Sequence, residues 1–206
     1  MRDDKIGDFL DRLAERIPAP GGGATAALHA AQAAALIGMV ARYSTGERYA
    51  AHATTIDRIR DTSDALREDA LRLAAEDAAA FTAVTDAHRL PKETDPQRAE
   101  RSAAIATALV GAAQPPARVI AVAATVLALA EELLPIGNPN VSTDVAAAAE
   151  AARAAATTAR VNVEVNLASV HDTTARVPLV AATDQVDELT TRADRLTADV
   201  REGIAG

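Results

Sequence analysis

Apolar residues recur along most of the chain at alternating steps of three and four, which is the spacing of one face of an α-helix. The clearest face lies within about 52–89 and reads Ile56, Ile59, Ser63, Leu66, Ala70, Leu73, Asp77, Ala80 and Val84. A second lies near the C-terminus, in Val186, Leu189, Ala193, Leu196 and Val200. No segment alternates apolar and polar residues over the length of a strand. The pattern predicts an all-α fold, a bundle of long antiparallel helices, in one domain over residues 1–206.

Proline and glycine divide this pattern into successive helices. A short helix is expected before the run Pro-Ala-Pro-Gly-Gly-Gly at 18–23, and a long one after it that ends near Ser44. Further helices are expected over about 52–89, 97–113, from there to 134, 143–170 and 183–204. The breaks between them fall at 91–96, at Pro115 and Pro116, at 135–139, and at Pro178, which precedes the last helix.

The composition supports this fold class and narrows the chemistry. Hydrophobic residues make up 49% of the chain but aromatic residues only 2%, and alanine dominates the apolar half. Alanine is the strongest helix former, yet it buries little area, so the core must come from close approach of long helices. An all-β sandwich or barrel would need many β-branched and aromatic strand residues and is excluded.

The charge and the missing cysteines remove several classes of function. Without cysteine there are no disulfides, thiolate metal sites or cysteine nucleophiles, and a cytoplasmic protein is expected. The four histidines lack metal-ligand spacing, so we expect neither a metal nor a cofactor. The net charge is −8 and no basic stripe is present, so no nucleic-acid partner is expected. No stretch is judged apolar enough to span a bilayer, so no membrane partner is expected either.

Asp77 interrupts the apolar face of the third helix. A carboxyl group among Leu73, Ala80 and Val84 should be partly desolvated, and desolvation raises its pKa toward neutrality. Such a group can hold and release a proton during a reaction. The alternative is a slightly rotated helix that leaves Asp77 half exposed or paired with an arginine, and periodicity alone favours that alternative.

Three further groups of residues are candidates for a binding site. Gly21, Gly22 and Gly23 precede a helix, where free backbone N–H groups can bind an oxyanion or carbonyl, or where glycines can let two helices cross closely. Asn162 and Asn166 share one helix face and suit a heterocycle edge, or an amide pair that bridges two helices. Asp144 lies near a helix start, which it can simply stabilise.

The loop after the third helix carries the best local positive patch. It contains Arg89 and Lys92, and Arg98 and Arg101 follow it. Such a patch is usually a solvated surface, but it can also hold an anionic part of a ligand.

These motifs occur together in an order that resembles the cyclodeaminase/cyclohydrolase family, which includes the C-terminal domain of formiminotransferase-cyclodeaminase and stand-alone methenyltetrahydrofolate cyclohydrolases. The resemblance covers nearly the whole chain. The runs that carry it are 18–23, Asp-Ala-Ala-Ala-Phe at 77–81, Leu-Pro-Lys at 90–92 with Arg101, Gly-Asn at 137–138, Thr-Asp at 143–144, and Asn-Val-Glu-Val-Asn-Leu at 162–167.

The resemblance implies an all-helical fold, a homodimer and a tetrahydrofolate derivative as substrate. It implies that Asp77 is the catalytic acid/base of a cyclodeaminase or a cyclohydrolase, two reactions that it does not separate. It also implies that the substrate is bound by a set of further residues: Gly21, Gly22, Gly23, Lys92, Arg101, Asn138, Asp144, Asn162 and Asn166. Lys92 and Arg101 would hold the glutamate tail.

Four positions depart from the family pattern. Ala24 replaces a common serine, Ala106 and Ala121 replace glutamine and glutamate, and Glu164 replaces lysine or arginine. Aromatic rings that could stack on a pterin are also few: Phe9, Tyr43, Tyr49 and Phe81. These departures motivate a second hypothesis, a related lyase or cyclase for a non-folate molecule. A third is a catalytically silent helical dimer that binds a partner.

Overall fold

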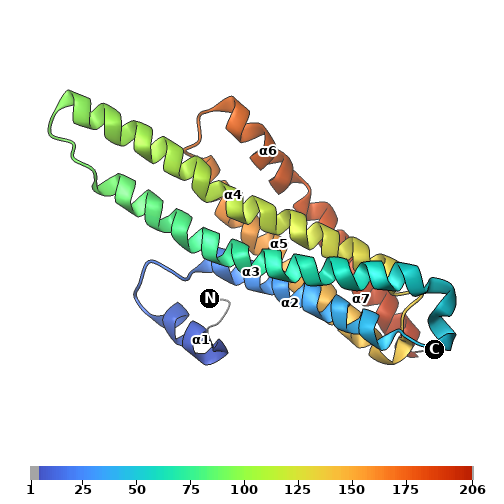
Figure 1. The fold of residues 1–206 in the computed structure, drawn as a ribbon. Coiled ribbons are helices and arrows are strands. Elements are labelled where there is room, and N and C mark those ends of the chain that lie inside the picture. Colours follow the sequence, from blue (N-terminus) through green and yellow to red (C-terminus); the bar gives the residue numbers. More distant parts are fainter. Residues whose placement is uncertain (1–4, 206) are drawn as a thin grey trace.

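The protein is a bundle of long helices that lie side by side (Figure 1). The computed structural model describes residues 5–205, and no strand occurs within that range, so the predicted all-α class is confirmed. The elements in chain order are α1 (Ile6–Ala14), α2 (Gly22–Tyr43), η1 (Glu47–His52), α3 (Ala53–Arg89), α4 (Asp95–Leu133), η2 (Pro139–Val141), α5 (Ser142–Leu167), α6 (Thr173–Asp184) and α7 (Val186–Ala205).

Helix α2 lies at the centre of the bundle. It packs against α3, α5 and α4, and most of its buried side chains are alanines, with Ile37 and Val40 as the large ones. Small side chains let neighbouring helices approach closely, so many short contacts replace the few large ones of an aromatic core. The core therefore follows from the alanine-rich composition.

By length and composition alone, α2 is also apolar enough to cross a membrane. This corrects the expectation that no stretch of the chain would be. In its most apolar window, 61% of the residues are buried inside the protein. The position of α2 at the centre of the bundle accounts for its apolar composition.

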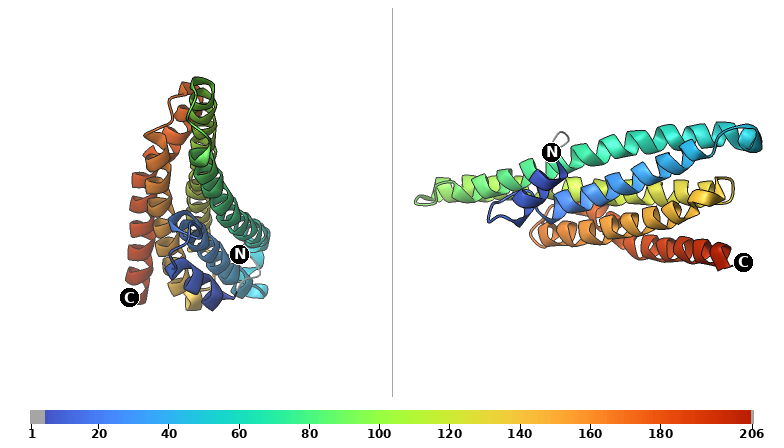
Figure 2. Two further views of the ribbon diagram at one scale, coloured as in Figure 1. Left: turned by 90° about the vertical axis from the view of Figure 1, so that its left-hand side faces the viewer. Right: turned by 90° about the horizontal axis from the view of Figure 1, so that it is seen from below.

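The two apolar faces read from the sequence point inward. Ile59, Ala70 and Leu73 of α3 are buried against the core, and all five apolar positions predicted for the last helix are buried in α7. α7 packs on α5 (Figure 2). The hydrophobic period therefore identified the buried face of each of these helices.

The predicted break at Pro115 and Pro116 is wrong, because α4 runs without interruption from Asp95 to Leu133. Each proline removes one backbone donor, which leaves the carbonyl groups of Gly111 and Ala112 without their usual partners. Both proline rings are buried, and α4 packs against α3 and α5. This packing holds the helix together despite the two missing hydrogen bonds.

The C-terminal boundaries also differ from those predicted. The expected helix over 183–204 is α7, which begins at Val186, and a separate helix α6 contains Pro178 in its interior. The side chain of Asp172 accepts a hydrogen bond from the backbone N–H of Thr174, so it caps α6. The sequence prediction placed the boundary at Pro178 and did not use this capping residue, which marks the true start of α6.

The end of α3 and the beginning of α4 form an arm that extends beyond the other helices (Figures 1 and 2). Thr94 and Gln97 form a capping box that starts α4, in which the Gln97 side chain accepts from the backbone N–H of Thr94 at 3.0 Å. The cap fixes where the chain reverses, and it therefore fixes which residues of α3 and α4 face each other along the arm.

Candidate functional site

The N-terminus of α2 lies directly against the carboxyl group of Asp77 on α3. A Cβ atom built on Gly23 would stand 2.0 Å from Oδ1 and 2.5 Å from Oδ2 of Asp77. No side chain fits there, so the glycine at this position is what lets the carboxyl group approach the helix end. The structure therefore bears on both interpretations of the glycines. Gly23 allows a close approach between α2 and α3, and the group that approaches it is the polar carboxyl group of Asp77.

Two opposing effects act on the pKa of Asp77. Partial burial raises the pKa above its ordinary value, and a hydrogen bond from the backbone N–H of Ala24 lowers it by a smaller amount. The net direction is upward, as expected for a carboxyl group desolvated on the apolar face and not for one paired with an arginine, the alternative that periodicity alone favoured. Glu76 next to it turns away and pairs with Arg118 at 2.7 Å.

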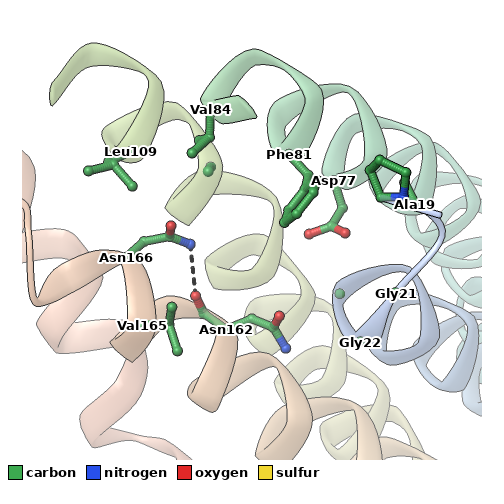
Figure 3. Close-up of a pocket in the computed structure, with 13 residues that line it drawn as sticks. Ala19, Gly21, Gly22, Asp77, Phe81, Val84, Leu109, Asn162, Val165 and Asn166 are labelled. Carbon is green, nitrogen blue, oxygen red and sulfur yellow. Dashed lines mark hydrogen bonds between the residues drawn. The ribbon is translucent and has the colours of Figure 1, made fainter. Parts of the chain in front are cut away.

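Asp77 faces a cavity of about 310 Å³ between the start of α2 and helices α3, α4 and α5 (Figure 3). It is the one titratable side chain among the described residues that line the cavity. The lining residues are Pro18, Ala19, Gly21, Gly22, Gly23, Asp77, Phe81, Val84, Leu109, Ala112, Asn162, Val165 and Asn166. The cavity thus joins three sequence motifs that lie far apart in the chain.

Asn162 and Asn166 enter the cavity from α5, on the side facing Asp77 (Figure 3). The Nδ2 of Asn162 donates to the carbonyl oxygen of Thr158 at 2.8 Å, and that of Asn166 donates to the carbonyl oxygen of Asn162 at 2.9 Å. Each amide is therefore held by its own helix rather than bridging two helices. The carbonyl oxygens of the side chains are left to accept hydrogen bonds from a ligand.

Apolar side chains form the end of the cavity nearer to the arm. Phe81, Val84 and Leu109 lie there, and 49% of the surface of Phe81 is exposed. From the sequence, Phe81 was one of four aromatic residues that could stack on a pterin and Val84 was an apolar position of the third helix, and neither was among the predicted site residues. The usable signal was their spacing, since Phe81 and Val84 follow Asp77 by four and seven residues and share its helix face.

Lys92 and Arg101 lie on the arm and do not line the cavity. Arg101 donates from Nε and Nη2 to the backbone carbonyl of His88, which ties α4 to the last turn of α3. Arg89 pairs with Asp86 and Arg98 with Asp95, so much of the predicted positive patch is neutralised locally. The binding of a substrate tail by Lys92 and Arg101 stays a prediction.

Asn138 and Asp144 lie at the opposite end of the bundle. The side chain of Asn138 donates to the backbone carbonyl of Tyr43, the last residue of α2, which lies roughly 33 Å along the helix from the glycines. The backbone N–H of Asn138 donates to Ser44 Oγ at 2.8 Å. Asp144 is in the first turn of α5, whose other end carries the two asparagines. Within one chain these two residues do not join the cavity around Asp77.

Of the four positions that depart from the family pattern, only Ala24 touches the site. It contacts Asp77 through its backbone N–H, a group that any residue in this position provides. Ala106, Ala121 and Glu164 are exposed and do not line the cavity. No group of three His, Cys, Asp or Glu side chains that could hold a metal ion occurs among residues 5–205.

Comparisons with known proteins agree with this geometry. A family model described as formiminotransferase-cyclodeaminase matches residues 5–185. The methenyltetrahydrofolate cyclohydrolase of Methylorubrum extorquens is 37% identical over 170 residues, which cover 82% of each chain. The formimidoyltransferase-cyclodeaminase of Mus musculus is 32% identical over 173 residues, which are 84% of this chain but 32% of the mouse protein. The chain thus spans about a third of that relative.

The crystal structure of formiminotetrahydrofolate cyclodeaminase from Thermotoga maritima has the same fold. It superposes with a TM-score of 0.86 at 28% sequence identity and covers 100% of this chain and 99% of its own. The matched segment includes the glycines, Asp77 and both asparagines of the cavity. The chain therefore belongs to the cyclodeaminase/cyclohydrolase family, as its ordered motifs predicted.

Proposed function

We propose that this protein is an enzyme that acts on a one-carbon derivative of tetrahydrofolate, with Asp77 as its acid/base. The observation that supports this most is the single titratable group in the cavity, a carboxyl group with a raised pKa beside the start of α2. A carboxyl group whose pKa is raised by burial keeps its proton to higher pH than an ordinary aspartate, so it can serve as both acid and base in a reaction. The names of the relatives supply the substrate class.

The first candidate reaction is the hydrolysis of methenyltetrahydrofolate. A water oxygen bonds to the methenyl carbon while the Asp77 carboxylate takes a proton from that water. The bond between this carbon and N5 then breaks, N5 receives the proton from Asp77, and the remaining hydroxyl proton leaves to solvent. The higher identity to a cyclohydrolase, 37% over most of both chains, favours this reaction.

The second candidate is the cyclodeamination of formiminotetrahydrofolate. N10 bonds to the formimino carbon, and protonated Asp77 gives its proton to the imine nitrogen. Asp77 then takes the proton of N10 and passes it to the departing amine, which leaves as ammonia. The full-length likeness to the cyclodeaminase of Thermotoga maritima favours this reaction.

The polar groups around Asp77 suit a pterin in both reactions. The side-chain oxygens of Asn162 and Asn166 can accept from ring N–H groups. The start of α2 adds backbone donors and the positive end of a helix dipole, which favour electron-rich atoms of the ligand. Together they orient a heterocycle so that its one-carbon group meets the acid.

The test is an absorbance assay of the methenyltetrahydrofolate chromophore with purified protein. The chromophore disappears in the first reaction and appears from formiminotetrahydrofolate in the second, with ammonia measured in parallel. Turnover with either substrate, at least a hundredfold above the enzyme-free rate, supports the proposal. The absence of turnover with both contradicts it and leaves the non-folate ligand and the silent dimer as the remaining hypotheses.

A further inference from the structure

The cavity is divided into a polar end and an apolar end along the axis of α3. The polar end contains Asp77, the glycines and Asn162. The other end, called the apolar end here, contains Phe81, Val84 and Leu109, with the amide of Asn166 beside them (Figure 3). A ligand that fills the cavity therefore meets several hydrogen-bonding groups at one end and, at the other, a mainly hydrocarbon surface with the single amide of Asn166. This division predicts a ligand with the same two parts.

Phe81 is the principal contact at the apolar end. Almost half of its surface is exposed, although large apolar side chains are generally buried. It is one of two phenylalanines in the chain, and the other, Phe9, is buried. An exposed aromatic side chain at the rim of a cavity is typical of a surface that a ligand covers, and a flat ring is its best partner.

The position of Phe81 relative to Asp77 selects which ring of the substrate it meets. Phe81 comes four residues after Asp77, so the two side chains lie on one helix face about 6 Å apart along the axis. The reacting carbon joins N5 and N10 in methenyltetrahydrofolate, and it is bound to N5 and closes onto N10 in formiminotetrahydrofolate. In both substrates N10 carries an aminobenzoyl ring. When that carbon is at Asp77, the aminobenzoyl ring reaches the level of Phe81.

The opposite orientation matches the cavity less well. It would place the pterin, with its ring N–H and carbonyl groups, against Phe81, Val84 and Leu109, where Asn166 is the one side chain that could pair with these groups and the others would lose their hydrogen bonds to water. Burial of unpaired polar groups is costly. It would also leave Asn162 and the glycines facing a benzene ring.

We propose that Phe81, with Val84 and Leu109, binds the aminobenzoyl ring of the substrate and thereby sets its orientation in the cavity. This inference rests on the proposed function. The pterin then occupies the end near the glycines and Asn162, and the glutamate tail leaves the cavity toward the arm. Phe81 is a specificity-determining residue rather than a catalytic one, since it touches a part of the substrate that does not react.

The test measures the binding of the two halves of the substrate separately, by NMR titration of the whole protein. One probe is p-aminobenzoylglutamate and the other is 6-methyltetrahydropterin. Phe81→Ala should weaken the binding of p-aminobenzoylglutamate about tenfold and Phe81→Leu about threefold, because leucine keeps apolar area but not the ring. Neither variant should change the affinity for the pterin by more than about twofold.

A matched control shows whether the effect belongs to the cavity. Tyr43 is 59% exposed at the other end of α2, so Tyr43→Ala also removes an exposed aromatic side chain and should change neither affinity. Phe81 variants should also keep the wild-type thermal midpoint within about 2 °C, since the side chain is half exposed.

Each outcome separates this inference from the proposed function. Loss of pterin affinity in Phe81→Ala with unchanged p-aminobenzoylglutamate affinity overturns the orientation, even in an active enzyme. No effect on either probe overturns the role of Phe81. Selective loss of the aminobenzoyl probe supports the inference, and it does so even if the intact folates prove unreactive, a result that would count against the proposed reaction alone.

Discussion

Asp77 owes its raised pKa to its immediate neighbours. Burial between α2 and α3 disfavours the charged carboxylate, and the N–H of Ala24 offsets this only in part. The approach is possible because Gly23 has no side chain. The proposed role of Asp77 therefore depends on residues that take no part in the reaction. The raised pKa and the space left by Gly23 can each be tested.

The two candidate reactions predict opposite responses to pH. Hydrolysis starts with ionised Asp77, so kcat/KM for methenyltetrahydrofolate should rise with pH and level off above the pKa of Asp77. Cyclodeamination starts with protonated Asp77, so kcat/KM for formiminotetrahydrofolate should fall through the same range. Rate profiles measured with enzyme-free blanks would check this, and a flat profile for the active reaction would argue against Asp77 as the titrating group.

The raised pKa of Asp77 should also make the free energy of unfolding depend on pH. Because the folded-state pKa of Asp77 lies above its ordinary value of 3.8, its contribution to stability is present below about pH 3.8 and is lost as pH rises through the folded pKa. Asp77→Asn removes this loss of stability, because asparagine does not ionise. The free energy of unfolding of the variant, relative to wild type, should therefore increase as pH rises from 4 toward neutrality in urea titrations. A difference independent of pH would contradict the raised pKa.

Gly23→Ala should be damaging and Gly21→Ala should not. The added Cβ meets Asp77 Oδ1 at 2.0 Å in the first case and nothing within 4 Å in the second. Overpacking of this kind costs about 1–3 kcal/mol. Urea denaturation should show that loss of stability for Gly23→Ala and not for Gly21→Ala, and Gly23→Ala should also lose activity. Equal stability of the two variants would mean that the carboxyl group has room to move away.

At the scale of elements, the helix faces were predictable and the helix ends were not. The period of three and four identified the buried faces of α3 and α7 and brought Asp77 to the cavity. The prolines misled, because Pro115 and Pro116 lie inside α4, where packing outweighs the loss of two donors. Pro178 also lies inside a helix, α6. The N-cap residue Asp172 is a more reliable marker of the start of α6 than this proline.

Arg101 makes a contact between two helices in addition to the ligand contact that is predicted for it. Its guanidinium binds the carbonyl oxygen of His88, which holds the two helices of the arm together. Arg101→Leu should therefore speed amide hydrogen exchange in the last turn of α3 by about tenfold, corresponding to about 1.4 kcal/mol of lost hydrogen bonding. Arg89→Leu, which removes only an exposed pair with Asp86, is the control. A rise in KM without faster exchange would instead assign Arg101 to the substrate tail.

At the scale of the whole molecule, the order of the helices decides which motifs can meet. α2 and α5 each have one end at the cavity and α3 passes along it, whereas Asn138 and Asp144 follow the reversal at the other end. Tracing these reversals along the sequence would have separated the two groups of candidates. Sequence motifs show membership in a family, but they do not show which motif residues share a site.

The homodimer expected from the family remains a prediction for the whole molecule. Val161, Val165 and Val177 are each more than half exposed on α5 and α6, and such residues are typical of an interface. Light scattering after gel filtration should give twice the chain mass of 21.2 kDa. Val161→Asp should shift the protein toward the monomer. A monomeric wild-type protein at micromolar concentration would contradict the prediction.

The most direct test of the account compares Asp77→Asn with wild type in the methenyltetrahydrofolate absorbance assay. Asparagine keeps the size of the side chain and can still accept from the N–H of Ala24, but it cannot carry the proton. We predict that kcat falls about a hundredfold to ten-thousandfold while the binding of p-aminobenzoylglutamate is retained. A variant that keeps activity within about threefold of wild type would contradict the role of Asp77 as the acid/base of the reaction.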